Sequence, residues 1–138
     1  MSEIEKIMDG SDLVALIVRS DYETKGVDFA TAPDEPQQLG LIGHQKGTII
    51  ASHYHPPAER KIATTTETLI IKKGRLRVDL YRGDQTALSS HILSPHDLIM
   101  IFRGGHGFEV LEDLQMIEVK QGPFMGEADK VRFQEKKS

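Results

Sequence analysis

The stretch "RLRVDLYRG", residues 75–83, decides the fold class, because apolar and charged residues alternate along it without interruption. Successive side chains of a β-strand point to opposite faces of the sheet. Leu76, Val78 and Leu80 would therefore lie on one face and the charged residues on the other. The pattern predicts a half-buried strand, which ends at a turn over "GDQ", residues 83–85.

The rest of the chain shows the same short period, and further strands are predicted over residues 15–20, 27–32, 38–44, 47–55, 63–74, 87–93, 97–102, 106–112 and 115–122. Turn signals separate these segments, as in all-β sandwiches and barrels. Only the first dozen residues carry a helical spacing, through Ile4, Ile7 and Met8. We therefore expect an all-β fold with a possible short N-terminal helix.

The composition is that of a soluble globular protein of 138 residues, with 38% hydrophobic and 28% charged residues. A chain of this length is expected to form one domain, spanning residues 1–138. The net charge of −4 and the scattered basic residues exclude a nucleic-acid partner. The longest apolar run, residues 98–102, is too short to span a membrane, and the acidic N-terminus does not resemble a signal peptide. There is no cysteine, which fits a cytoplasmic protein and restricts any metal site to His, Asp, Glu and water ligands.

Two histidines lie one residue apart in "GTIIASHYHPP", residues 47–57. On a strand, His53 and His55 would continue the face of Ile49 and Ala51, which points into the core. Buried imidazoles are costly unless they are paired or bind a metal, and two rings at this spacing can reach one ion. The prolines at 56 and 57 would end the strand directly after His55, because proline cannot donate to the ladder.

Two further residues occupy equivalent positions on other predicted strands. Glu67 leads an apolar face that continues through Leu69, and His106 leads one that continues through Phe108. Three strands would thus each place a ligand-type side chain at the head of an inward face. The shared register predicts a metal site built from His53, His55, Glu67 and His106.

The motifs of this sequence resemble those of the cupin superfamily. The first cupin motif has a glycine, an HxH pair, a glutamate and a second glycine, and Gly47, His53, His55, Glu67 and Gly74 follow that order. The second motif ends in proline, glycine and histidine, where this chain has Arg103, Gly105 and His106. The resemblance implies a double-stranded β-helix, or jelly-roll barrel, with its core over about residues 38–122, N-terminal strands within 13–32 and a C-terminal arm over 123–138. It also implies that His53, His55, Glu67 and His106 bind Fe, Mn, Ni or Zn, and that the protein is a homodimer.

The spacing departs from the cupin pattern at two places. Eleven residues separate His55 from Glu67, and Glu59 occupies the shorter spacing that is usual in the motif. Glu59 is therefore an alternative ligand, although the distance to Gly74 favours Glu67. His106 follows Gly105 directly, which shifts the register of the second motif.

Several charged residues are candidates for substrate binding. Arg60 and Arg103 flank the predicted site in the sequence and could pair with an anionic substrate, although ordinary solvated charges are the alternative. Lys120 shares a strand face with Glu118 and would line the cavity if that face is the inner one. The other alternative, that Ile117 and Val119 form the core, is favoured. The apolar residues of the arm suggest that it packs on something.

The resemblance implies a metal-dependent small-molecule enzyme, an oxygenase, isomerase or epimerase acting on a small polar, anionic or sugar-derived substrate. No catalytic residue is assigned at this point. One alternative is a non-catalytic, metal-containing module that binds a small ligand. The other is a metal-independent sugar-nucleotide isomerase or epimerase with a His base and a Tyr acid, for which the sequence offers no inward-facing tyrosine.

Overall fold

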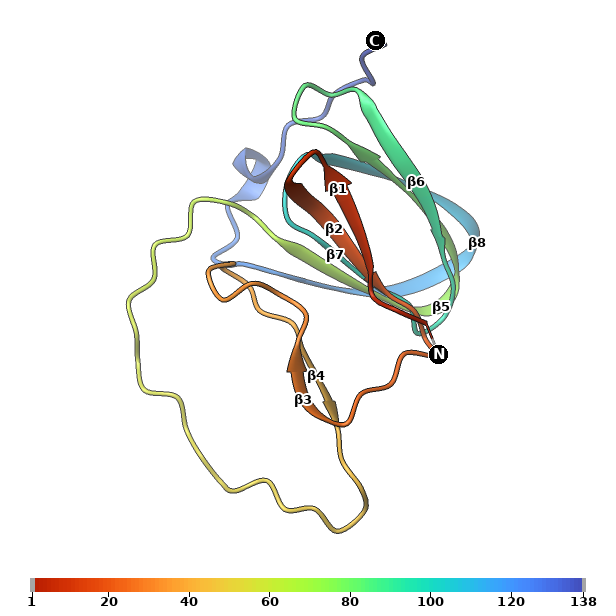
Figure 1. Cartoon of the computed structure of the whole chain (residues 1–138). Coiled ribbons are helices and arrows are strands. Elements are labelled where there is room, and N and C mark those ends of the chain that lie inside the picture. The colour runs from red at the N-terminus through yellow and green to blue at the C-terminus, as the bar shows by residue number, and fades with distance from the viewer. Residues whose placement is uncertain (1, 138) are drawn as a thin grey trace. The chain divides into compact units, whose positions relative to one another are not determined.

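The computed structural model describes residues 2–137, which form two compact units. The first unit contains residues up to 22 and from 65 onward, and the second contains residues 23–64. The described part is all-β, apart from a single 3-10 turn at Gly126–Asp129 (Figure 1). No helix of residues 2–137 is long and apolar enough to cross a membrane.

The first unit is a six-stranded antiparallel sheet. Its strands are β1 (Glu5–Asp9), β2 (Asp12–Val18), β5 (Glu67–Tyr81), β6 (Ala87–Leu93), β7 (Leu98–Ile101) and β8 (Gly105–Lys120). They lie in the order β1-β2-β7-β5-β6, and β8 pairs with β5. The sheet curls into a half-barrel, and Figure 1 shows β8 as a long curved strand.

The long strand β5 organises this half-barrel because it changes partners along its length. Its first residues pair with β7 and its last residues with β6, whereas β8 follows it along almost the whole length. Three register shifts interrupt the β5–β8 ladder near Gly74. Such irregularities bend a strand and increase its twist, which accounts for the curl.

The hydrophobic core lies on the concave face of the sheet. It confirms the buried face that the alternation in residues 75–83 predicted. Leu76, Val78 and Leu80 are buried, together with Leu69 and Ile71 from the first half of β5. These side chains pack with residues from the neighbouring strands in one cluster. Burial of these apolar side chains is the main stabilising contribution to the sheet.

The prediction of an N-terminal helix is wrong. Residues Glu5–Asp9 form strand β1, which pairs antiparallel with β2, and Gly10 allows the tight turn between them. Ile7 is buried on the sheet face, whereas Met8 is exposed. Three residues at helical spacing are too few to predict a helix. As a strand, this segment forms backbone hydrogen bonds with β2 and buries Ile7 at the same time.

The second unit contains a two-stranded antiparallel sheet of β3 (Gly26–Phe29) and β4 (Gly40–Gly43). The predicted strand over residues 47–55 is absent, and residues 44–66 contain no strand. The side chains from Ile49 to His55 are all exposed. Alternation specifies the two faces of a strand, but a strand forms only where a partner pairs with its backbone, and no ladder includes this segment.

Candidate functional site

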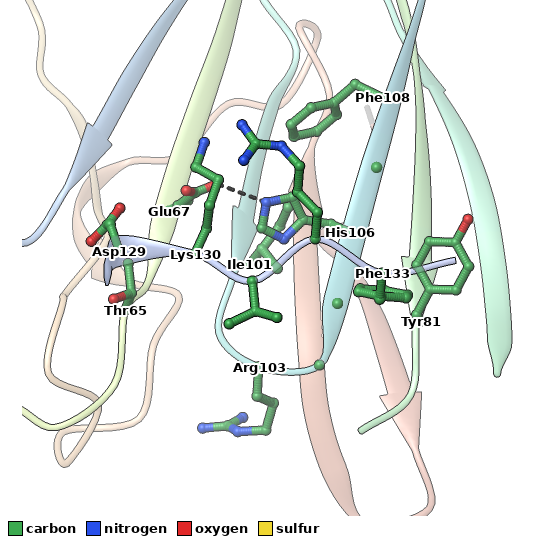
Figure 2. A pocket seen from close by; sticks show the side chains of 15 residues that line it. Thr65, Glu67, Tyr81, Ile101, Arg103, His106, Phe108, Asp129, Lys130 and Phe133 are labelled. Atoms are coloured by element: carbon green, nitrogen blue, oxygen red, sulfur yellow. Dashed lines mark ion pairs between the residues drawn. The ribbon is translucent and has the colours of Figure 1, made fainter. Parts of the chain in front are cut away.

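An open pocket of about 600 Å³ lies at one end of the half-barrel. The first residues of β5 and β8 line it, together with the turn between β7 and β8 and residues 129–133 of the C-terminal arm (Figure 2). The volume lies within the range of small-molecule sites in proteins. The pocket is therefore large enough to hold a metabolite beside the side chains on its floor.

Glu67 and His106 meet in this pocket. Glu67 is the first residue of β5 and pairs with Ile101, the last residue of β7. The chain then turns through residues 102–104 and enters β8, whose second residue is His106. This short connection brings His106 Nε2 to 3.0 Å from Glu67 Oε2, as the dashed line in Figure 2 marks.

The pair is largely buried, since the side chains of Glu67 and His106 are 14% and 28% exposed. The contact with His106 lowers the pKa of Glu67, and this effect outweighs burial, which opposes it. Among residues 2–137, Oε2 of Glu67 is buried without a well-aligned hydrogen bond. This oxygen can therefore accept a further donor or bind a cation.

At the end of β8, the side chains on the inner face of the sheet are not the ones that the sequence favoured. Met116 packs against the core, and Glu118 and Lys120 pair with Leu69 and Glu67 on the same face. Ile117 and Val119 are 44% and 49% exposed, so the expectation that they form the core is wrong. The inner face is polar here because Glu118 and Lys120 lie beside Glu67, and Lys120 pairs with Asp129 of the C-terminal arm.

Glu118 and Lys120 extend the polar cluster around Glu67. Burial, followed by the charge of Glu67, raises the pKa of Glu118. Lys120 Nζ lies 2.8 Å from Asp129 Oδ2 and 5.9 Å from the centre of the Phe124 ring. Lys120, a predicted substrate ligand, is thus already paired with a carboxylate of the C-terminal arm.

Arg103, another predicted substrate ligand, lines the pocket. Its guanidinium donates a hydrogen bond to the carbonyl of Leu13 and lies 5.7 Å from the centre of the Phe102 ring. Figure 2 shows its side chain directed away from His106. Arg103 therefore holds the turn between β7 and β8, next to the pocket, in place.

The other predicted site residues lie in the second unit. His53 and His55 are exposed, and their ring centres are 5.4 Å apart in an edge-on arrangement. His53 Nδ1 is 2.8 Å from the carbonyl oxygen of Ala51. Glu59 and Arg60 are also exposed on this segment. Within residues 2–137, no three or more His, Asp or Glu side chains form a group that could hold a metal.

Sequence reasoning missed the contribution of the C-terminal arm to the pocket. Phe133 packs edge-on against Tyr81, with ring centres 5.2 Å apart, and against Gly105, where a Cβ atom would lie 2.5 Å from the Phe133 ring. The arm thus packs on its own chain. The apolar residues of the arm indicated packing, but nothing in their spacing indicated the partner.

Comparison of the chain with protein-family models, with curated proteins and with solved structures gives no match.

Proposed function

We propose that this protein is a small-molecule enzyme of the cupin type, with a jelly-roll fold and with its reaction centre at Glu67 and His106. The observation that supports the proposal is the buried pair of these side chains inside an open pocket of about 600 Å³. An imidazole–carboxylate pair that is poorly solvated and faces a cavity is a common arrangement at reaction centres.

The pair offers two donors of the kind that a divalent metal ion uses. Imidazole nitrogen and carboxylate oxygen suit Fe, Mn, Ni and Zn, and Oε2 of Glu67 lies 3.0 Å from the His106 nitrogen with which it would share the ion. We propose that His53 and His55 supply the remaining protein ligands. When bound, the ion would act as a Lewis acid or as a redox centre for a substrate in the pocket.

The chain's own groups can also move a proton. His106 accepts or donates a proton at Nδ1, the ring nitrogen that does not face Glu67, and the carboxylate of Glu67 beside Nε2 stabilises the imidazolium that results. Glu118 adds a carboxyl group with a raised pKa next to Glu67. These groups are the basis of a second candidate, a metal-independent isomerase or epimerase with His106 as the base.

In the described part of the chain, no tyrosine lining the pocket is placed to act as the acid of this metal-independent isomerase or epimerase. Tyr81 lines the pocket, but its ring packs on Phe133, and Figure 2 shows its hydroxyl directed away from His106. The acid would therefore be Glu118, whose raised pKa favours the protonated form that an acid needs.

Metal analysis of tag-free protein separates the two candidates. After reconstitution with Fe, Mn, Ni or Zn and removal of free ions, we expect about one equivalent of metal per chain. The variants His106→Ala, His53→Ala and His55→Ala should each lose it, whereas the control His44→Ala, which replaces another exposed histidine of the second unit, should retain it.

The pattern of losses decides among the proposals. Retention of metal by His106→Ala would contradict the metal centre at this pocket. Loss in His106→Ala but not in His53→Ala would assign the metal to the pocket without the HxH pair. No metal in the wild type would favour the second candidate, which predicts exchange of a substrate C–H proton with solvent deuterium. Bound metal without turnover of hydroxy acids or sugar derivatives would indicate a binding module.

A further inference from the structure

The pocket lining is positively charged although the protein is acidic. Three cationic side chains, Arg103, Lys130 and Arg132, face two carboxylates, Glu67 and Asp129, among the lining residues. The whole chain carries a net charge of −4. A concave surface with the opposite sign to the rest of the protein attracts and orients ligands of the complementary charge.

The carboxylates of the lining already have partners. Glu67 is paired with His106, and Asp129 is paired with Lys120, a cation from outside the lining set. Within residues 2–137, no carboxylate lies within 4.0 Å of the cationic groups of Lys130 or Arg132. The charges of Lys130 and Arg132 are therefore not neutralised by an ion pair among the described residues, although the charge of Lys130 also acts on Glu118.

Both cations lie on a stretch of the arm that is fixed at its two ends. Asp129, directly before Lys130, is held by Lys120 at 2.8 Å. Phe133, directly after Arg132, packs on the ring of Tyr81 at 5.2 Å. The backbone at Lys130 is extended, with φ −145° and ψ 155°, and both Lys130 and Arg132 line the pocket.

The arm is also anchored beyond Phe133. The N–H of Lys136 donates to the carbonyl of Gln85 at 3.0 Å, and a bridge links Lys136 with Thr86. A binding site whose backbone is fixed before the ligand arrives loses less entropy on binding. The backbone between Asp129 and Phe133 is therefore held in place before a ligand binds, and it positions the side chains of Lys130 and Arg132 at the pocket.

We propose that Lys130 and Arg132 bind the anionic group, a carboxylate or a phosphate, of the small substrate whose reacting end lies at Glu67 and His106. The guanidinium fork suits two oxygens of such a group, and the lysine adds a point charge. The assignment of the reacting end rests on the proposed function. Binding of the anion does not depend on it, because both cations belong to the arm.

Titration calorimetry of the full-length, metal-free protein at low ionic strength tests this site with two matched pairs of probes. Succinate is compared with succinamide, and glycerol 3-phosphate with glycerol. We expect each anion to bind at least about tenfold more tightly than its neutral counterpart, and added salt to weaken the binding. The relative strength of succinate and glycerol 3-phosphate identifies which anionic group the site prefers.

The double variant Lys130→Gln/Arg132→Gln should lose this preference for the anions. The control Lys72→Gln/Lys73→Gln removes the same charge from two exposed residues of β5 and should bind as the wild type does. Equal binding of anion and neutral probe, or equal loss in both double variants, would overturn the proposal. Because the protein is free of metal in these titrations, a failed metal reconstitution leaves their outcome unaffected.

Discussion

His106 Nε2 lies 3.0 Å from Glu67 Oε2, and the two residues stand at the beginnings of two strands that run antiparallel along their length. In the β5–β8 ladder Glu67 pairs with Lys120 and His106 pairs with Leu80, so the ladder alone would hold them far apart. They meet because the sheet curls and because β7 delivers the chain to the start of β8 beside Glu67. The site is thus a product of the curvature of the sheet.

The Glu67–His106 pair should make stability depend on pH in the acidic range. The pKa of Glu67 is lowered in the folded protein, so its contribution is present above the pKa of the unfolded chain and is lost as pH falls through the folded pKa. We expect Glu67→Gln to cost about 1 kcal/mol at pH 7 and progressively less towards pH 3. Urea unfolding of both proteins across this range measures the difference. A cost that is the same at both pH values would contradict an ionised Glu67.

Glu118 should have the opposite effect on stability. Its pKa is raised by burial and by Glu67, so folding favours the protonated acid, and that stability is lost as pH rises through the folded pKa. We therefore expect Glu118→Gln to raise the melting temperature at pH 8 and to leave it unchanged at pH 4. The control Glu127→Gln, at an exposed position of the arm, should do neither. A lower melting temperature of Glu118→Gln at pH 8 would argue against repulsion between the two carboxyl groups.

The sequence predicted most strand segments of the half-barrel, but not strand β1, not the continuity of β5 and β8, and not the irregular course of the segment that carries the HxH pair. The alternation around Leu80 predicted a strand and its buried face, and both are present. The alternation around His53 predicted the same, and the segment is exposed and irregular. Periodicity describes how a strand would orient its side chains, whereas pairing depends on a partner elsewhere in the chain.

Two features of the site needed the structure because they depend on contacts distant in the sequence. The inner face at the end of β8 carries Glu118 and Lys120, which pair with Leu69 and Glu67 across the ladder, and the more apolar face lies outside. Lys130 and Arg132 line the pocket because Asp129 pairs with Lys120 and Phe133 packs on Tyr81. Neither relationship leaves a periodic signal along the chain.

The close approach of β5 and β8 at Gly74 should make this position intolerant of a side chain. Gly74 has φ +89°, and a Cβ atom there would lie 2.1 Å from the carbonyl oxygen of Asp113. We expect Gly74→Ala to destabilise the protein by about 2–4 kcal/mol, since the backbone is strained and the ladder must shift. Chemical denaturation measures this loss.

Gly10→Ala is the control that separates backbone strain from the clash at Gly74. Gly10 also has a positive φ, +61°, but nothing lies within 4 Å of the position of its Cβ atom. It belongs to the same unit, so the same unfolding transition reports on both variants. We expect Gly10→Ala to cost only about 1 kcal/mol. Equal losses in the two variants would show that the contact with Asp113 contributes nothing.

Asp97 joins three parts of the half-barrel and should be its most sensitive polar residue. Its buried carboxylate accepts hydrogen bonds from the backbone N–H of Ser20 at 2.9 Å and of Ser94 at 2.8 Å, and from Arg19 at 3.2 Å. Asp97→Ala leaves both N–H groups without this acceptor and removes one partner of the guanidinium. We expect a loss of about 3–5 kcal/mol in the free energy of unfolding.

Asp97→Asn tests whether the charge or the hydrogen bonds of this side chain matter more. Its amide oxygen can still accept from one backbone N–H, but its NH₂ group would face the other N–H and Arg19 as a second donor. We expect a loss of about 2 kcal/mol, between those of the wild type and Asp97→Ala. Asp34→Ala removes an exposed carboxylate from the second unit and should leave the urea midpoint unchanged. An Asn variant as stable as the wild type would show that neither the charge nor the second acceptor oxygen of Asp97 stabilises the junction of β2 and β7.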